Sequence, residues 1–281
     1  MSLRKIYIIT GPTASGKSRL ALQMAQTLNG MVINADSMQI YRDLKILTAR
    51  PDETETSSVP HLLYGYADSF YENNVQDWLE KVVQVIEQCD KPVFVGGTGL
   101  YINALINGLS PIPPVDPAIR TQVRSMTLEE VKSRVCDCSA TDSQRLRRAL
   151  EVQLTTGKSL AYFQKLPKIS FVKADFQIYF VHPERSILYE QCNKRLIQMI
   201  ERGAIDEVRH LITIGATGGV CKAIGVSEIK SYLEGQISYN MMVNQIQLAT
   251  RHYAKRQCTW FKHQLSSAIE ITDPTKFVFT K

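Results

Sequence analysis

The feature that most constrains this chain is a glycine-rich loop at residues 11–18, set between an apolar, β-branched run and a segment with helical periodicity. The loop reads Gly-Pro-Thr-Ala-Ser-Gly-Lys-Ser and fits the pattern G-x-x-x-x-G-K-[ST]. A strand before this pattern and a helix after it are the context that a phosphate-binding loop requires. A glycine-rich turn with a chance Lys-Ser pair is the structural alternative.

The physics of such a loop is direct. Its glycines let backbone N–H groups turn inward around an anion, and the N-terminus of the next helix adds a partial positive charge. Lys17 supplies a point charge for phosphate oxygens, and the Ser18 hydroxyl suits Mg²⁺. The loop therefore predicts a di- or triphosphate site without naming the reaction, because kinases, ATPases and other transferases share it. The residues expected to bind phosphate are Gly11, Pro12, Thr13, Ala14, Ser15, Gly16, Lys17 and Ser18.

Short apolar strands alternate with helical segments along much of the chain. Strands are predicted at 5–10, 31–35, 92–95 and 176–181, and helical periodicity runs through 20–28 and 75–89. This alternation predicts a parallel sheet with helices on both faces. Four prolines lie between Pro111 and Pro117 and form a stiff connector that excludes helix. Residues 118–165 then show helical patterns and no convincing strand.

These patterns define the expected fold class and domains. We expect an α/β fold, in which a P-loop NTPase-like parallel sheet is flanked by helices and interrupted by a smaller, mainly helical insertion domain. The core domain is expected at 1–110 plus 173–281, and the insertion domain at 111–172.

Polar residues follow two of the predicted strands. Asp36 comes after the second strand, and Thr98 lies in a Gly-Gly-Thr-Gly loop after the third. In an open α/β sheet this edge faces the ligand crevice. Asp36 could hold Mg²⁺ through water or accept a proton from a nucleophile, and a helix N-cap is the alternative. The Thr98 loop is either part of the same crevice or a tight turn.

Composition limits the class of protein and its surroundings. Lys plus Arg total 33 against 27 acids, so the net charge is +6, which permits an anionic partner without requiring one. The six cysteines, which include Cys138, form no C-x-x-C pair. No apolar run approaches the ~18 residues that a membrane helix needs, and the first run is too short for a signal-peptide core. We therefore expect a cytoplasmic protein with reduced thiols and no membrane contact.

Two basic clusters fall on predicted helices. In residues 242–263 one apolar stripe holds Met242, Ile246, Ala249, Tyr253 and Trp260, and the neighbouring arc holds Arg251, His252, Lys255, Arg256, Lys262 and His263. The apolar side is expected to pack on the core while the basic arc meets phosphates. Arg145, Arg147 and Arg148 form the second cluster, with Leu146, Leu150 and Leu154 as its packing side. A solvated basic face is the alternative in both cases.

The order and spacing of the motifs resemble one known family. Besides the phosphate loop, they are Asn34–Arg42, Val95–Tyr101, Thr48–Pro51, Pro60-His61, Asp116–Arg120, Gln144–Glu151, Gly203–Val208 and Arg251–Gln257. Together they resemble the tRNA dimethylallyltransferase (tRNA isopentenyltransferase) family over nearly the whole chain.

The resemblance implies transfer of a dimethylallyl group from its diphosphate to N6 of adenosine 37, beside the tRNA anticodon, with Mg²⁺ as cofactor and diphosphate released. It implies that Thr13–Ser18 and Arg195 hold the donor diphosphate, that Asp36 accepts the N6 proton, and that Thr98 helps position the reacting groups. Lys17, Asp36 and Thr98 are thus the expected catalytic residues, and Ser18 the expected metal ligand.

The partners follow from the same resemblance: the anticodon stem-loop of tRNA and dimethylallyl diphosphate, bound by a monomer. The expected tRNA-binding residues are Asp36, Ser37, Met38, Gln39, Thr98, Arg120, Gln144, Arg145, Leu146, Arg147, Arg148, Arg251, Lys255 and Arg256. The chain departs from the family pattern at Leu47, where many members have glycine, and at Val226 and Ser227, which replace an aromatic and a basic residue.

Three other functions share part of this pattern. A free adenine-nucleotide isopentenyltransferase has the same loop and an early aspartate, but it has no use for the two basic clusters. A small-molecule kinase has the same loop and needs a lid over its phosphates, which residues 118–150 could supply. An RNA-binding protein with a vestigial nucleotide site would not need intact Lys17, Ser18 and Asp36.

Overall fold

The structure is a computed structural model that describes residues 3–136, 139 and 142–279. The chain divides into two compact units, which are Met1–Ile106 with Val172–Lys281, called the core unit, and Asn107–Phe171, called the insertion unit. Cys138 lies outside the described residues, and the described cysteines, Cys89, Cys136, Cys192, Cys221 and Cys258, are free thiols. No helix in the described ranges is long and apolar enough to cross a membrane.

The core unit is built on a parallel sheet. Its described strands are β1 (Lys5–Thr10), β2 (Met31–Asn34), β3 (His61–Leu62), β4 (Pro92–Gly96), β5 (Asp175–Val181) and β6 (Ile269–Ile271). They lie in the order β3-β2-β4-β1-β5-β6, and every neighbouring pair is parallel. The predicted fold class and the four predicted strands are confirmed. The short edge strands β3 and β6 were not predicted.

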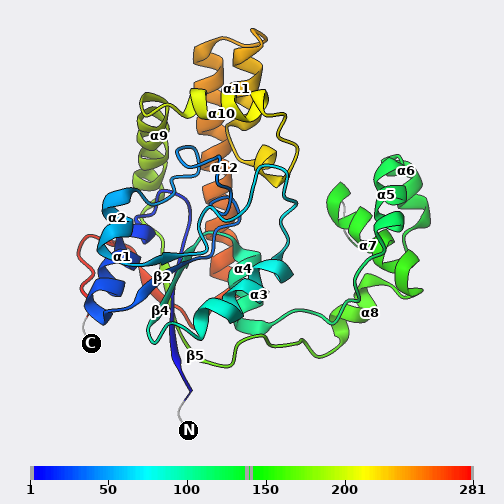
Figure 1. The fold of residues 1–281 in the computed structure, drawn as a ribbon, viewed down its shortest axis with the longest axis horizontal. Coiled ribbons are helices and arrows are strands. Elements are labelled where there is room, and N and C mark those ends of the chain that lie inside the picture. Colours follow the sequence, from blue (N-terminus) through cyan, green and yellow to red (C-terminus); the bar gives the residue numbers. More distant parts are fainter. Residues whose placement is uncertain (1–2, 137–138, 140–141, 280–281) are drawn as a thin grey trace. The chain divides into compact units, whose positions relative to one another are not determined.

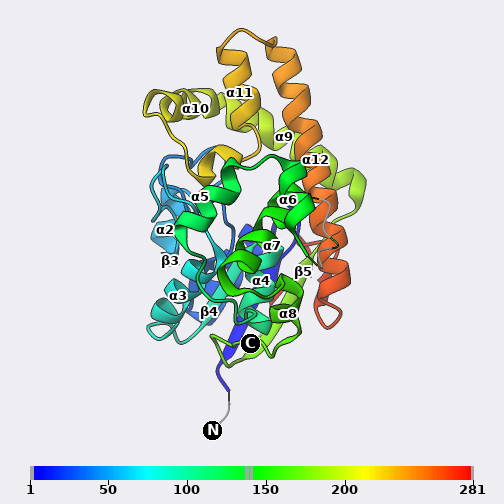
Figure 2. The same cartoon turned by 90° about the vertical axis from the view of Figure 1, so that its right-hand side faces the viewer.

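Helices cover the sheet and extend beyond it. The core unit contains α1 (Lys17–Leu28), α2 (Glu53–Ser58), α3 (Val75–Ile86), α4 (Gly99–Asn107), α9 (Arg185–Glu201), α10 (Ala204–Thr213), the 3-10 turn η1 (Gly219–Lys222), α11 (Val226–Leu233) and α12 (Tyr239–Gln264). Figures 1 and 2 show α10, α11 and the start of α12 gathered at one end of this unit.

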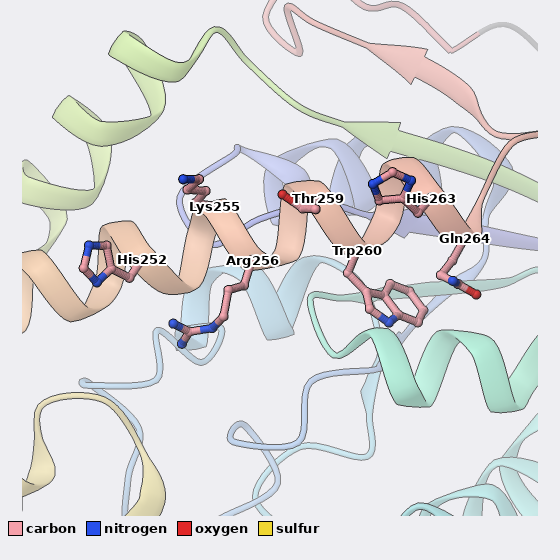
Figure 3. Close-up of a pocket in the computed structure, with 7 residues that line it drawn as sticks. All are labelled: His252, Lys255, Arg256, Thr259, Trp260, His263 and Gln264. Carbon is pink, nitrogen blue, oxygen red and sulfur yellow. The ribbon is translucent and has the colours of Figure 1, made fainter. Parts of the chain in front are cut away.

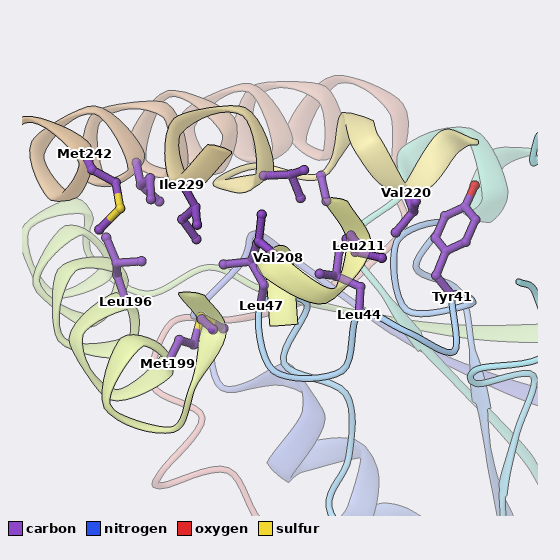
Figure 4. Close-up of a cluster of buried hydrophobic side chains, with 14 of the residues drawn as sticks. Tyr41, Leu44, Leu47, Leu196, Met199, Val208, Leu211, Val220, Ile229 and Met242 are labelled. Atoms are coloured by element: carbon purple, nitrogen blue, oxygen red, sulfur yellow. The ribbon is translucent and has the colours of Figure 1, made fainter. Parts of the chain in front are cut away.

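The packing of α10, α11 and α12 creates a hydrophobic cluster separate from the sheet, here called the end cluster. Figure 4 shows its side chains, which include Leu47, Leu196, Val208 and Met242. Leu47, one of the departures from the family pattern, is buried here. The position of a Cβ on Gly225 would lie 3.1 Å from Leu47 Cδ1, so this leucine fills the space beside the turn that starts α11.

The long helix α12 corrects one prediction. Met242 and Ile246 are buried as expected, but the stripe continues through Ala254, Gln257 and Phe261 rather than through Tyr253 and Trp260. The helix packs first on the end cluster and then beside the sheet, so the direction of burial changes along its length. An apolar periodicity cannot predict the burial of Gln257, which depends on hydrogen bonds with distant residues.

The insertion unit is helical in its described part. It contains α5 (Pro117–Ser125), α6 (Leu128–Arg134), α7 (Ser143–Thr156) and α8 (Leu160–Lys165). Leu146 and Leu150 pack against Val123 and Val131 in a small core. Leu154, expected on the packing side, is instead 42% exposed because it lies on the outer side of α7. Leu109 and Ile169 pair through both backbone N–H groups, which brings the two ends of this unit together.

Candidate active site

The phosphate loop has the backbone conformation that its glycines predict. Gly11, Ala14 and Gly16 have φ values of +154°, +62° and +85°. A Cβ on Gly11 would collide with the carbonyl oxygen of Val181, so the loop requires glycine there. Gly16 is the N-cap of α1, and it places the start of that helix directly behind the loop. The loop therefore presents N–H groups and a helix N-terminus to one space.

Two cations lie at this loop. Lys17 Nζ donates to the Pro12 carbonyl at 3.1 Å, and the Arg195 guanidinium of α9 donates to Thr13 Oγ1. Burial lowers the pKa of Lys17 to about 8, while the nearby carboxylate of Asp36 opposes this change and Arg195 adds to it. Burial likewise lowers the pKa of Arg195. A bound polyanion would offset the cost of holding two desolvated cations close together.

Two serines of the loop are placed differently. Ser15 is 2% exposed, and its Oγ has no hydrogen-bond partner among the described residues. A buried hydroxyl without a partner is costly, so this atom fits a ligand that accepts a hydrogen bond from it. Ser18 lies exposed on the first turn of α1, where its hydroxyl is free to meet a hydrated cation. Both positions fit a diphosphate accompanied by Mg²⁺.

The structure places Asp36 beside the phosphate loop, as predicted. The Asn34 side chain fixes the turn that follows β2, because it accepts from the Asp36 N–H and donates to the Asp36 and Leu63 carbonyls. Asp36 Oδ1 accepts from the Met38 N–H at 2.9 Å, and no described residue donates to Oδ2. The carboxylate thus caps a turn through one oxygen and leaves the other available.

The Thr98 loop is joined to the Asp36 turn. Thr98 Oγ1 accepts from the Ser37 N–H at 3.0 Å and donates to Ser37 Oγ at 3.2 Å. A Cβ on Gly96 would collide with the Ala35 carbonyl, so the glycine lets β4 end against β2. Thr98 is therefore bonded to the turn that carries Asp36, and the Asp36 carboxylate lies near enough to act on the charge of Lys17.

Two further residues of the Asp36 turn face the protein. Gln39 Nε2 donates to the Thr48 carbonyl at 3.0 Å, and Met38 packs against the end cluster. The segment around Thr48, which Gln39 contacts, is also bound by Glu207 of α10. The Glu207 carboxylate accepts hydrogen bonds from the N–H groups of residues 45–47. Of the four predicted tRNA contacts in this turn, Asp36 and Ser37 have half-buried side chains on the side of the Thr98 loop.

Sequence reasoning missed Gln257 of α12. Its Oε1 accepts from the Thr13 N–H at 2.8 Å, and its Nε2 donates to the Gly97 carbonyl at 2.7 Å. One buried amide therefore bonds both the phosphate loop and the Thr98 loop. The signal in the sequence is that Gln257 is the last residue of the Arg251–Gln257 motif, which by itself assigns the glutamine no role.

An open hollow of about 600 Å³ lies along the C-terminal half of α12 (Figure 3). Its lining residues are His252, Lys255, Arg256, Thr259, Trp260, His263 and Gln264. A Cβ on Gly99 would run into the Trp260 ring, so the hollow adjoins the Thr98 loop. Of the three predicted tRNA contacts on α12, Lys255 and Arg256 line this hollow, whereas Arg251 donates to Asn193 Oδ1 of α9 at 2.9 Å.

The basic cluster of the insertion unit is divided by its contacts. Arg147 donates to the carbonyls of Val123 and Met126, which fixes the turn between α5 and α6. Leu146 is 3% exposed and packs in the core of the unit, which leaves its side chain no surface for RNA. Four predicted RNA contacts keep exposed or half-exposed side chains: Arg120, Gln144, Arg145 and Arg148.

The charges around Glu151 also shape this surface. Its carboxylate lies 3.5 Å from Arg148 Nη1 and 4.0 Å from Arg120 Nε. Both arginines therefore pair with the largely buried Glu151, and this shared partner brings their guanidinium groups near each other. No group of three or more His, Cys, Asp or Glu side chains in the described residues could hold a metal on its own.

Comparisons with known proteins place this chain among similar sequences. The family model of IPP transferase matches residues 39–264. The tRNA dimethylallyltransferase of Zymomonas mobilis is 40% identical over 97% of this chain and 92% of its own length, and that of Bartonella tribocorum is 42% identical over 97% and 100%.

Solved structures show the same likeness. A eukaryotic dimethylallyltransferase acting on tRNA superposes with a TM-score of 0.83 at 26% identity, over 97% of this chain and 75% of that one. The full-length tRNA isopentenylpyrophosphate transferase of Bacillus halodurans gives 0.72 at 29% identity, over 96% and 90%.

Proposed function

The chain belongs to the IPP transferase family, and from this premise we propose that it transfers a dimethylallyl group from dimethylallyl diphosphate to N6 of adenosine 37 in tRNA. The observation that carries the proposal is the joined site. The negative charge of Asp36 favours the charged forms of Lys17 and Arg195 at the phosphate loop. Asp36 lies in the turn whose Ser37 N–H donates to Thr98. This coupling supports a site in which the donor and acceptor groups react side by side.

The donor half of the reaction needs stabilisation of a leaving diphosphate. The allylic C1–O bond breaks, and its electron pair goes to the bridging oxygen. Backbone N–H groups of the phosphate loop, Lys17 and Arg195 stand ready for that charge. Ser15 Oγ, buried without a partner, fits a phosphate oxygen. The preorganised charge is worth most when the crevice excludes water.

Ser18 would hold Mg²⁺ together with oxygens of the diphosphate. When bound, the ion would neutralise part of the diphosphate charge. Because the described residues offer no separate cluster of metal ligands, the ion would depend on the donor for most of its coordination.

The acceptor half uses the carboxylate of Asp36. Adenine N6 is a weak nucleophile, because its lone pair is delocalised into the ring. As the N6–C1 bond forms, Asp36 takes the N6 proton, and Oδ2 is the oxygen available for it. Thr98 holds the turn that aims this carboxylate. The adenosine must leave its stack to reach the crevice, as other base-modifying enzymes require.

The RNA itself would meet two basic surfaces. Lys255 and Arg256 reach the hollow beside the Thr98 loop. Arg120, Gln144, Arg145 and Arg148 offer the second surface on the insertion unit. Phosphate contacts of this kind would position the anticodon stem-loop without reading its bases. We propose that a monomer in the cytoplasm does this.

The test is incubation of the protein with labelled dimethylallyl diphosphate, Mg²⁺ and either unmodified tRNA or AMP. We expect label in N6-isopentenyladenosine after digestion of the tRNA, and none on AMP. Label on AMP alone would support a free-nucleotide transferase instead. ATP turnover without prenyl transfer would support a kinase. A tRNA whose adenosine 37 is replaced by guanosine is the matched control for the position.

A further inference from the structure

Gln257 uses both ends of one amide group. Its Oε1 accepts from the phosphate loop, at the Thr13 N–H, and its Nε2 donates to the loop after β4, at the Gly97 carbonyl. Gln257 is 6% exposed, so its amide is largely shielded from water. A single side chain on α12 thus connects two loops that belong to different strands of the sheet.

The two loops meet Gln257 in a matched way. A Cβ on Gly97 would collide with Gln257 Nε2, so the absence of a side chain at Gly97 is what admits the amide. The ends of the strands below are already fixed, because β1 pairs with β4 and Thr10 Oγ1 donates to the Gly96 carbonyl. Gln257 therefore acts on the loops beyond the strands, where the backbone is not held by the sheet.

The two hydrogen bonds of Gln257 connect the loop that would bind the diphosphate to the loop beside Asp36. On one side Thr13 Oγ1 accepts from Arg195. On the other side Thr98, which follows Gly97, accepts from the Ser37 N–H beside Asp36. A shift in the Gln257 amide would therefore move the anion site relative to the carboxylate.

We infer that Gln257 is a positioning residue that sets the spacing between the phosphate loop and the Asp36–Thr98 side of the crevice. The inference rests on the proposed prenyl transfer. Its physical basis is that reaction depends steeply on alignment, and a misplacement of about 1 Å costs about 10²-fold in rate. Affinity for either substrate depends on other contacts and should change less.

The first test replaces Gln257 by methionine, which keeps the approximate volume and adds no charge but removes both bonds. We expect the single-turnover rate of transfer to fall about 10²-fold, with much smaller changes in the Kd of tRNA and of inorganic diphosphate. Gln245→Met is the matched control, because Gln245 lies exposed on the same helix. The Gln245 variant should keep the wild-type rate.

The second test approaches the same bond from the other partner. Gly97→Ala should displace the amide and lower the rate in the same way, with binding retained. Because the two changes break one interaction, the double variant Gly97→Ala/Gln257→Met should be little slower than the slower single variant. If the two changes acted independently, the rate of the double variant would fall by the product of the two single losses, and that result would contradict the inference.

The outcomes separate the inference from the proposed function. Absence of transfer by the wild-type protein would overturn the function itself. Transfer by the wild type with an unchanged rate in Gln257→Met would overturn the inference alone. A parallel loss of rate, substrate affinity and thermal stability in Gln257→Met would also overturn it, because that pattern marks a general packing role.

Discussion

At the scale of single residues, Asp36 is the group whose chemistry is most directly open to test. Asp36→Asn keeps an oxygen for the Met38 N–H but cannot take a proton from N6. We expect turnover to fall by about 10²–10⁴-fold, the usual contribution of a general base, while tRNA binding stays close to that of the wild type. Single-turnover kinetics and filter binding measure the two quantities. A loss of tRNA affinity with unchanged turnover would contradict the proton-acceptor role.

Lys17 makes a prediction about pH. Burial lowers its pKa to about 8 in the free protein, so the side chain is charged below that pH and neutral above it. The advantage of the wild type over Lys17→Met in binding inorganic diphosphate should therefore be largest near pH 7 and shrink as pH rises through 8. Calorimetric titration of both proteins at pH 7 and pH 9 measures this advantage. A constant ratio of the two Kd values would mean that the Lys17 charge is not what binds the anion.

At the scale of elements, two arginines of α7 should behave differently although they are two residues apart. Arg147 donates to backbone carbonyls of the α5–α6 turn, whereas Arg145 is exposed and pairs with Asp142. Arg147→Ala should lower stability by roughly 1–3 kcal/mol, since it leaves carbonyls without their donor. Arg145→Ala should change it little. Chemical denaturation compares the two, and equal destabilisation would contradict the assignment.

The helix α12 makes a prediction about salt. Lys255→Ala/Arg256→Ala should weaken tRNA binding and reduce the slope of log K against log salt by about one for each phosphate that the protein no longer neutralises. Lys230→Ala is the matched control, because Lys230 is an exposed lysine of α11 outside both basic clusters. An unchanged slope in the double variant would place the RNA elsewhere. Arg251 is not included, since its guanidinium bonds α9.

At the scale of the whole molecule, the ligand should be visible in stability. A diphosphate that binds only the folded core unit stabilises it by about 2.7 kcal/mol at 100 times its Kd. We expect inorganic diphosphate with Mg²⁺ to raise the melting temperature, EDTA to reduce that gain, and Arg195→Gln to diminish it. Differential scanning fluorimetry measures the shifts. An equal gain in the wild type and the Arg195 variant would exclude a contact of this arginine with the anion.

The features of the fold and site that could be predicted from the sequence are those that depend on residues close together in the chain. The phosphate loop, the β1 and β4 strands and the turn at Asp36 each follow from a few adjacent residues. The edge strands β3 and β6 could not be predicted, because strands of two and three residues are defined by their neighbours. The bond between Gln257 and Thr13 joins residues 244 positions apart, and no periodicity carries that information.

The insertion unit leaves and rejoins the chain at one paired spot. Leu109 and Ile169 exchange backbone hydrogen bonds of 3.0 and 2.8 Å, and Gly108 has the positive φ that lets the chain turn there. The insertion unit therefore begins and ends at two residues that are hydrogen-bonded to each other. A segment joined in this way can become longer or shorter while the register of the strands in the core unit is preserved. Under the proposed function, the RNA surface of this unit could then change without disturbing the residues of the core unit.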